Sequence, residues 1–150
     1  MHRRRFFLSC AALLMSGVIA PLMAQTPVFF SDGGSAINGY DTVAYFTQRA
    51  PVKGRRDISV MWKGVVWRFA NDANREAFEA DPWAYAPQYG GYCAYGVSMG
   101  YRDITVPNAW QIVDGKLYLI RTRLVQAIWK RDVNGHIVRA NANWPAVLSH

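Results

Sequence analysis

The chain has 150 residues, of which 51% are hydrophobic and 18% are charged, and its formal net charge is +7 at pH 7. This length suffices for one compact domain and is too short for two of ordinary size. The lysines and arginines are scattered and accompany no nucleic-acid-binding motif, so the composition argues against a nucleic-acid partner.

Residues 1–24 have the order of parts that is typical of a secretory signal. Arginines 3–5 form a charged start, residues 11–20 are mostly apolar, and Ala24 offers a small residue for cleavage. The apolar run is too short to span a bilayer. Residues 4–8 match the twin-arginine export motif R-R-x-F-L, with an ordinary export signal as the alternative. We therefore expect the signal to be removed and the mature protein to be periplasmic or secreted, with no membrane span.

Removal of this segment would change the charge and leave one cysteine. The mature chain would carry +4, because three of the 17 Lys and Arg leave with the signal and all ten Asp and Glu remain. Cys10 would leave as well, so Cys93 would have no internal disulfide partner in an oxidising compartment. A lone exported thiol is exposed to oxidation unless it is used or hidden.

The mature chain begins with a segment that favours no regular structure. Residues 25–36 are predicted to be a loose leader, with its flexible point at the Gly-rich stretch 32–35. Residues 39–46 are predicted to form a short helix in which Asp41 accepts hydrogen bonds from the first free amides. The expected buried side of this helix consists of Val43, Ala44 and Phe46.

Residues 58–69 predict a β-hairpin whose two-residue turn is Lys63-Gly64. Opposed residues of a hairpin share one face of the sheet, so this turn places six large apolar side chains together. A shift of one residue would destroy that segregation. The expected pairs are Trp62 with Val65, Val60 with Trp67, and Ile58 with Phe69.

Two short helices are predicted after this hairpin. Asn71 is a natural N-cap for the first, which the pair Asp81-Pro82 ends. Asp81 can then cap a second helix that begins at Pro82 and runs towards Pro87. The apolar stripe of the first helix contains Ala73, Ala77 and Phe78.

A second hairpin is predicted at residues 110–120, with its turn at Asp114-Gly115. Its expected pairs are Ile112 with Leu117 and Trp110 with Leu119. Thr122 then caps a helix that we expect to end at Asn134-Gly135. Apolar residues recur in this helix at helical spacing, namely Leu124, Ala127, Ile128 and Val133.

These elements predict an α+β fold with one small domain at residues 37–145 and a tail at residues 146–150. Both hairpins are expected to join one antiparallel sheet, packed with three to four short helices. Trp67 and Trp110 should therefore be buried. The residues expected to pack against the hairpin faces are Ala73, Ala77, Phe78, Leu124 and Ile128.

Five blocks of the chain, in order, resemble the exported YHS-domain family. They are residues 39–46, residues 67–96 with a double glycine before Cys93, residues 109–119, Trp129 with Asp132, and residues 143–145. The resemblance covers nearly the whole mature chain. It implies a small secreted or periplasmic protein with suspected metal or thiol chemistry.

The chain departs from this family pattern in one respect that concerns its chemistry. Related modules attached to copper and heavy-metal transporters use paired cysteines, and the first would be expected within residues 39–46, which contain none. A two-cysteine metal site therefore does not carry over. Thr42 also stands where the pattern predicts a proline, which affects helix initiation only.

Cys93 is the first candidate for a functional residue, as a thiolate that binds a soft metal or undergoes redox change. Met99 and His136 are the further candidate ligands, because Cys, Met and His together suit a copper ion. The alternative is that Cys93 is a small buried hydrophobe, that Met99 fills a gap, and that His136 is a solvated surface residue. The tyrosines could line a pocket or complete the core with their hydroxyls near the surface.

Three hypotheses about function remain open at this point. The first is an exported metal-handling or metal-sensing protein, with copper as the favoured ion and Cys93 as its ligand. The second is a thiol-redox protein that uses Cys93 with the cysteine of another periplasmic protein. The third is a non-catalytic partner-binding module in which Cys93 is inert packing. No catalytic residue is expected, because the sequence contains no paired carboxylates, Ser-His-Asp set, phosphate loop, haem motif or zinc motif.

Overall fold

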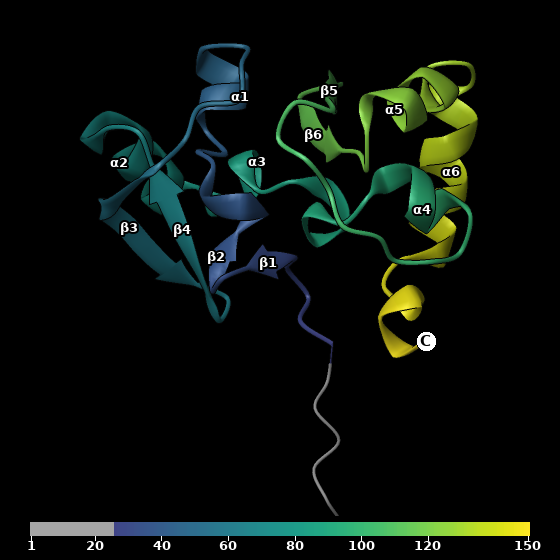
Figure 1. Ribbon diagram of the computed structural model, residues 1–150, viewed down its shortest axis with the longest axis horizontal. Helices are drawn as coiled ribbons and strands as arrows, with labels where there is room; N and C mark the ends of the chain where they lie inside the picture. Colours follow the sequence, from purple (N-terminus) through teal and green to yellow (C-terminus); the bar gives the residue numbers. More distant parts are fainter. Residues whose placement is uncertain (1–25) are drawn as a thin grey trace, which may run out of the picture.

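The computed structural model describes residues 26–150 and has the α+β architecture that the sequence predicts (Figure 1). The expected signal at residues 1–24 lies outside the described residues. The strands are β1 (Ser31–Asp32), β2 (Ser35–Ala36), β3 (Arg55–Trp62), β4 (Val65–Phe69), β5 (Trp110–Val113) and β6 (Lys116–Leu119). The α-helices are α1 (Ala44–Thr47), α2 (Asp72–Ala80), α3 (Pro82–Tyr85), α4 (Ala94–Ser98), α5 (Arg123–Trp129) and α6 (Val133–Asn143). Three 3₁₀ turns complete the chain: η1 (Ile37–Gly39), η2 (Gln88–Gly91) and η3 (Ala146–Ser149).

The strands form two sheets, so the prediction of one antiparallel sheet is wrong. The larger sheet has the order β1-β2-β4-β3, and β5 and β6 form a separate two-stranded sheet. The edge of β4 that a second hairpin could have joined is already occupied, because β2 pairs with β4 in parallel at Ser35 and Val66. In Figure 1 the larger sheet lies at one end of the molecule and helices α4, α5 and α6 at the other, with β5 and β6 between them.

The predicted hairpin registers are confirmed except at one end. Val65 opposes Trp62, and Trp67 opposes Val60, around a turn in which Lys63 and Gly64 both have positive φ. The pair of Ile58 with Phe69 is wrong, because an irregularity between Arg55 and Ser59 places Arg55 opposite Phe69. The second hairpin has both predicted pairs.

The first hydrophobic cluster joins the two hairpins through side chains and not through hydrogen bonds. Trp67 and Phe69 of β4 pack with Phe78 of α2 and with Leu117 and Leu119 of β6. Trp67 is buried as predicted, whereas Trp110 is half-buried. Ala77 packs against this cluster, but Ala73 is exposed, so the predicted stripe of α2 is right at two of its three positions.

The second cluster lies under helices α4, α5 and α6. The prediction of one helix from Thr122 to Asn134-Gly135 is wrong, because two helices, α5 and α6, cover this stretch. The chain turns between α5 and α6, and Asp132 caps α6 by accepting a hydrogen bond from the Gly135 amide at 3.0 Å. Gly135 therefore lies in the first turn of a helix and does not end one. The inward residues are Val125 and Trp129, while Leu124 is 75% exposed and does not pack on a hairpin.

The described part of the predicted loose leader, residues 26–36, is ordered and spans both clusters. Phe29 is buried in the first cluster and Phe30 in the second. The Phe30 amide donates a hydrogen bond to the Gly90 carbonyl at 2.8 Å, and the Tyr92 hydroxyl donates one to the Pro27 carbonyl at 2.8 Å. We call residues 26–30 the N-terminal strap.

The expected tail is also part of the fold, since residues 146–149 form η3 and bury Val147 in the second cluster. Over residues 26–150, no helix combines the length and the apolar character needed to cross a membrane.

Candidate functional site around Cys93 and residues 99–104

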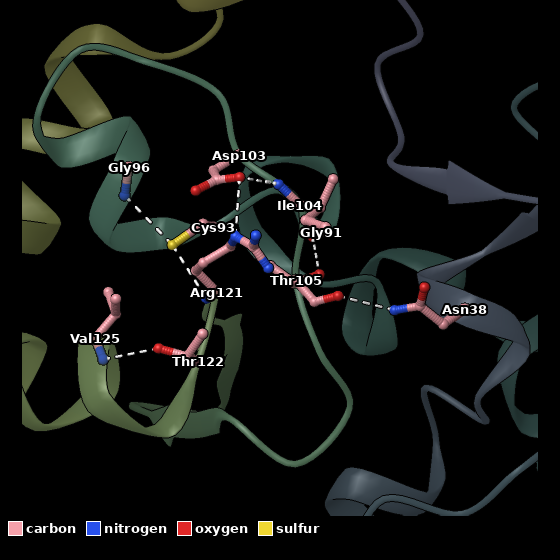
Figure 2. A network of polar contacts seen from close by, with 10 residues as sticks. All are labelled: Asn38, Gly91, Cys93, Gly96, Asp103, Ile104, Thr105, Arg121, Thr122 and Val125. Carbon is pink, nitrogen blue, oxygen red and sulfur yellow. Dashed lines mark hydrogen bonds and ion pairs between the residues drawn. The ribbon is translucent and has the colours of Figure 1, made fainter.

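Cys93 is held at the start of α4 by backbone hydrogen bonds. Its own amide donates to the Asp103 carbonyl at 3.0 Å. Its Sγ accepts from the Gly96 amide at 3.4 Å, which makes Cys93 the N-cap of α4, and from the Arg121 amide at 3.2 Å (Figure 2). Only 1% of the residue is exposed. The sulfur therefore has two protein donors and almost no access to solvent.

The environment of Cys93 favours the neutral thiol. Burial raises the pKa of the Cys93 thiol, and the hydrogen bonds from the Gly96 and Arg121 amides, together with the nearby Tyr95 amide, oppose this without cancelling it. The carboxylate of Asp103 raises the pKa further. The guanidinium of Arg121 forms an ion pair with Asp103 at 3.2 Å, so this cation is directed at the Asp103 carboxylate and not at the Cys93 sulfur. Burial and the raised pKa therefore disfavour the thiolate form, which is the nucleophile and the metal ligand.

His136 lies in α6 and is buried, with 8% of its surface exposed, so the interpretation as a solvated surface residue is wrong. Its ring stacks on Trp129 with centroids 5.5 Å apart. Its Nδ1 lies 3.0 Å from the Ser98 hydroxyl and accepts a hydrogen bond from the Arg139 guanidinium at 2.9 Å. Because a guanidinium can only donate, this contact requires an unprotonated Nδ1.

The same contacts explain the protonation state of His136. Burial, and then the positive charge of Arg139, lower the pKa of the His136 imidazole, and Asp132 opposes the shift. An imidazole whose Nδ1 faces a guanidinium is a poor ligand for a cation through that atom. Met99 follows α4 at the surface and is 55% exposed.

Cys93, Met99 and His136 are thus placed in three different settings: a buried helix cap, an exposed loop and a helix–helix contact. No recorded hydrogen bond or ring contact links them within the described part of the chain. Among residues 26–150, no group of three or more His, Cys, Asp and Glu side chains could hold a metal ion.

The most prominent surface feature near Cys93 is the loop that follows α4. Three of its apolar side chains are about half exposed: Met99 at 55%, Tyr101 at 49% and Ile104 at 48%. Beside them lies a hollow of about 430 Å³ lined by Tyr92, Tyr101, Arg102, Asp103 and Ile104, among others. We call residues 99–104 with this hollow the loop surface.

The loop surface is firmly attached to the fold. The Tyr101 amide donates to the Gly96 carbonyl at 3.0 Å, and a Cβ at Gly96 would lie 3.1 Å from the Tyr101 ring. At its other end the Thr105 hydroxyl donates to the Gly91 carbonyl at 2.8 Å, and the Asn38 amide donates to the Thr105 carbonyl at 2.9 Å (Figure 2). The exposed side chains are therefore presented on a fixed backbone.

Sequence reasoning considered Met99 as a metal ligand or as a gap-filling residue and did not identify this surface. The available signal was a methionine, a tyrosine and an isoleucine around Gly100 and Arg102, in a segment with no helical or strand periodicity. Three other tyrosines have hydrogen-bond partners within the fold, which agrees with the prediction that the tyrosines complete the core. Tyr45 donates to the Pro107 carbonyl, Tyr89 to Asn141 and Tyr92 to the Pro27 carbonyl, and burial raises the pKa of each hydroxyl.

Searches of family models, curated proteins and solved structures found no match to this chain.

Proposed function

We propose that this protein is a non-catalytic binding module that recognises a partner protein through the loop surface, with Cys93 as part of the core. The observation that carries the proposal is the exposure of Met99, Tyr101 and Ile104 on a fixed loop beside a hollow. Met, Tyr and Arg are enriched at protein interfaces, and all three occur here. Exposed apolar side chains beside a hollow are typical of protein interaction sites.

The attachment of the loop also supports this proposal. A surface that is ordered before it binds loses little conformational entropy on association. The backbone bonds from Tyr101 to Gly96 and from Cys93 to Asp103 supply that order. Cys93 then serves the function indirectly, as the cap of the helix on which the loop is mounted.

A site-specific photocrosslinker tests this proposal. A benzophenone side chain is introduced at Tyr101 and, as a matched control, at Leu124, which is 75% exposed on another face. After irradiation of living cells, we expect one protein adduct of defined mass from position 101 and none from position 124. Ile104→Ser should weaken the adduct while the protein stays folded by circular dichroism. Equal labelling at both positions, or none at either, would contradict the proposal.

We also propose that the protein is exported and belongs to the YHS-domain family, on the strength of the sequence patterns at residues 4–8, 39–46 and 67–96. The lone buried cysteine agrees with an oxidising compartment, where an accessible thiol would be a liability. Replacing Arg4 and Arg5 together by lysine should stop export by the twin-arginine route. Unchanged export would indicate an ordinary signal.

The metal-handling and thiol-redox hypotheses have less geometric support than the binding module. Both need an accessible thiolate at Cys93, whereas this thiol is buried and its pKa is raised. A Cu(I) titration separates the hypotheses. The wild-type protein and Cys93→Ser should take up the same amount of copper with the same affinity. A tight site that disappears in Cys93→Ser would restore the copper hypothesis.

A further inference from the structure

A second cavity, of about 250 Å³, lies between the N-terminal strap, α3, η2 and α6. It is separate from the loop surface and shares no lining residue with it. Aromatic rings and carboxamides supply most of its specific chemistry: Phe29, Trp83, Gln88, Tyr89, Asn141 and Trp144. We call it the aromatic cavity.

We propose that the aromatic cavity binds one ring of a neutral saccharide. Within the described residues, none of the side chains that line the cavity carries a formal charge. A phosphorylated, carboxylated or cationic ligand would therefore find no counter-charge among the lining side chains, and the ammonium of Lys63 lies over the Trp83 ring outside that lining. A sugar ring presents an apolar face of C–H groups and a rim of hydroxyls, which match flat aromatic walls and amide hydrogen-bonding groups.

Trp83 supplies the exposed aromatic wall. It is 64% exposed, although a tryptophan ring gains more from burial than almost any other side chain. The ring is nevertheless held in place, because it makes an edge contact with Trp62 at 4.8 Å and lies 5.7 Å from the ammonium of Lys63. A fixed and exposed tryptophan at a cavity is suited to stack on a ligand. Trp144, near the C-terminal end of the chain, supplies a second ring. Its ring centroid lies 6.0 Å from that of Tyr89.

One carboxamide of the cavity, that of Asn141, has a defined orientation. The Tyr89 hydroxyl donates a hydrogen bond to Asn141 Oδ1 at 2.8 Å. This contact sets the orientation of the Asn141 carboxamide and leaves its Nδ2 as a donor for a ligand hydroxyl. Gln88 contributes a second carboxamide, which can donate and accept. Hydroxyl groups, which do both, are the natural partners of such a pair.

The remaining wall is the N-terminal strap, and it is fixed rather than mobile. Its backbone lies so close to η2 that a Cβ at Gly90 would be 1.8 Å from the Val28 carbonyl oxygen. The hydrogen bonds from Phe30 to Gly90 and from Tyr92 to Pro27 hold the strap at both ends. The cavity is thus preformed, and its volume suits a single ring rather than a large cofactor.

Calorimetry of the purified protein with three neutral probes tests the proposal: maltotriose, cellotriose and chitotriose. We expect saturable binding of at least one of them at millimolar concentrations or below, with quenching of tryptophan fluorescence. Trp83→Ala should weaken this binding about tenfold or more and Gln88→Ala by a smaller factor. Leu124→Ala, at an exposed position away from the cavity, should leave the affinity unchanged.

Two outcomes would overturn the proposal. One is the absence of binding by all three saccharides, and the other is binding that Trp83→Ala does not affect. A proline-rich decapeptide serves as the competing probe, since aromatic grooves also bind such peptides. Binding of the peptide alone, lost in Trp83→Ala, would assign the cavity to peptide and not to saccharide. Thermal unfolding of each variant shows whether it is folded, and Ile104→Ser should bind saccharide normally because the loop surface is a separate site.

Discussion

The carboxylate of Asp41 accepts a hydrogen bond from the side-chain amide of Asn74 at 2.8 Å, and both residues are buried. The same Oδ2 also accepts from the Ala70 amide at 2.8 Å, and Oδ1 accepts from the amides of Val43 and Ala44. Asp41 therefore connects the start of α1 to the end of β4 and to the first turns of α2. The sequence predicted the cap of α1 but not the two contacts to distant residues.

We expect Asp41→Ala to destabilise the protein by about 4 kcal/mol, because three buried donors and the partly buried Ala70 amide would lose their acceptor at once. Urea denaturation measures this loss. Asp72→Ala is the control: Asp72 is an exposed residue of the first turn of α2 with a 3.5 Å ion pair to Arg75, and its removal should cost less than about 1 kcal/mol. Similar losses for both variants would show that Asp41 does not act as a hub.

Cys93 should behave as a structural residue. Cys93→Ser keeps an acceptor for the Gly96 and Arg121 amides and should change the free energy of unfolding by less than about 1 kcal/mol. Cys93→Ala leaves both amides without that acceptor and should cost about 2 kcal/mol. A thiol reagent such as DTNB should modify the native protein far more slowly than the urea-unfolded chain. Rapid modification of the native protein would instead indicate a functional thiol.

His136 should make the fold sensitive to mild acid. Its folded-state pKa is lowered by burial and by Arg139, so the unfolded chain binds the proton more readily than the folded one. The free energy of unfolding should therefore fall as the pH decreases through about 6.5, and this contribution should level off below the folded-state pKa. Unfolding in urea between pH 8 and pH 5 measures the slope.

The control for this pH dependence is a comparison of two histidine variants. His136→Gln should have a shallower slope than the wild-type protein, whatever its absolute stability. His150→Gln, at the exposed last residue, should keep the wild-type slope. A slope that is unchanged in His136→Gln would show that other groups cause it.

Gly90 should tolerate substitution far less well than another glycine of similar backbone conformation. Gly90 and Gly64 both have positive φ, at 63° and 79°. A Cβ at Gly64 would meet no atom within 4 Å, whereas one at Gly90 would overlap the Val28 carbonyl. Gly64→Ala should cost about 1 kcal/mol from backbone strain, and Gly90→Ala about 3 kcal/mol or more because the strap must also move. Equal losses in thermal or urea unfolding would contradict the close approach.

Local chemistry made much of this fold predictable from the sequence. Asn71, Asp81 and Thr122 each accept a hydrogen bond from the amide three residues later, as their positions before helices predict. The turns at Lys63-Gly64 and Asp114-Gly115 set the hairpin registers, because a two-residue turn leaves one pairing open. Each of these features depends on residues a few positions apart.

The features that the sequence did not reveal have different causes, and one of them is a contact between distant residues. Ser35 pairs with Val66 and so occupies the edge of β4 that the second hairpin could have joined, but nothing near either residue indicates the pairing. A glycine at this position usually ends a helix. Here Gly135 lies in the first turn of α6 and makes room for the Asp132 carboxylate, because a Cβ at Gly135 would lie 2.1 Å from Asp132 Oδ2. The interior position of His136 follows from that continuation of α6. The loop surface was missed because exposure of an apolar residue has no sequence pattern.

The adjacent residues Phe29 and Phe30 point into different clusters, which has a consequence for the way the protein loses its structure. The strap connects the two clusters as β6 and the residue after it do, where Leu117 and Leu119 belong to the first cluster and Tyr118 and Ile120 to the second. Neither cluster can open fully while the strap keeps a phenylalanine in the other. We therefore expect the two clusters to melt in one transition, and a chain that starts at Ser31 to melt at a lower temperature because it lacks both phenylalanines. The segment is also made before Gly90, its docking partner, so on the ribosome the strap can take its place only after the middle of the chain has emerged.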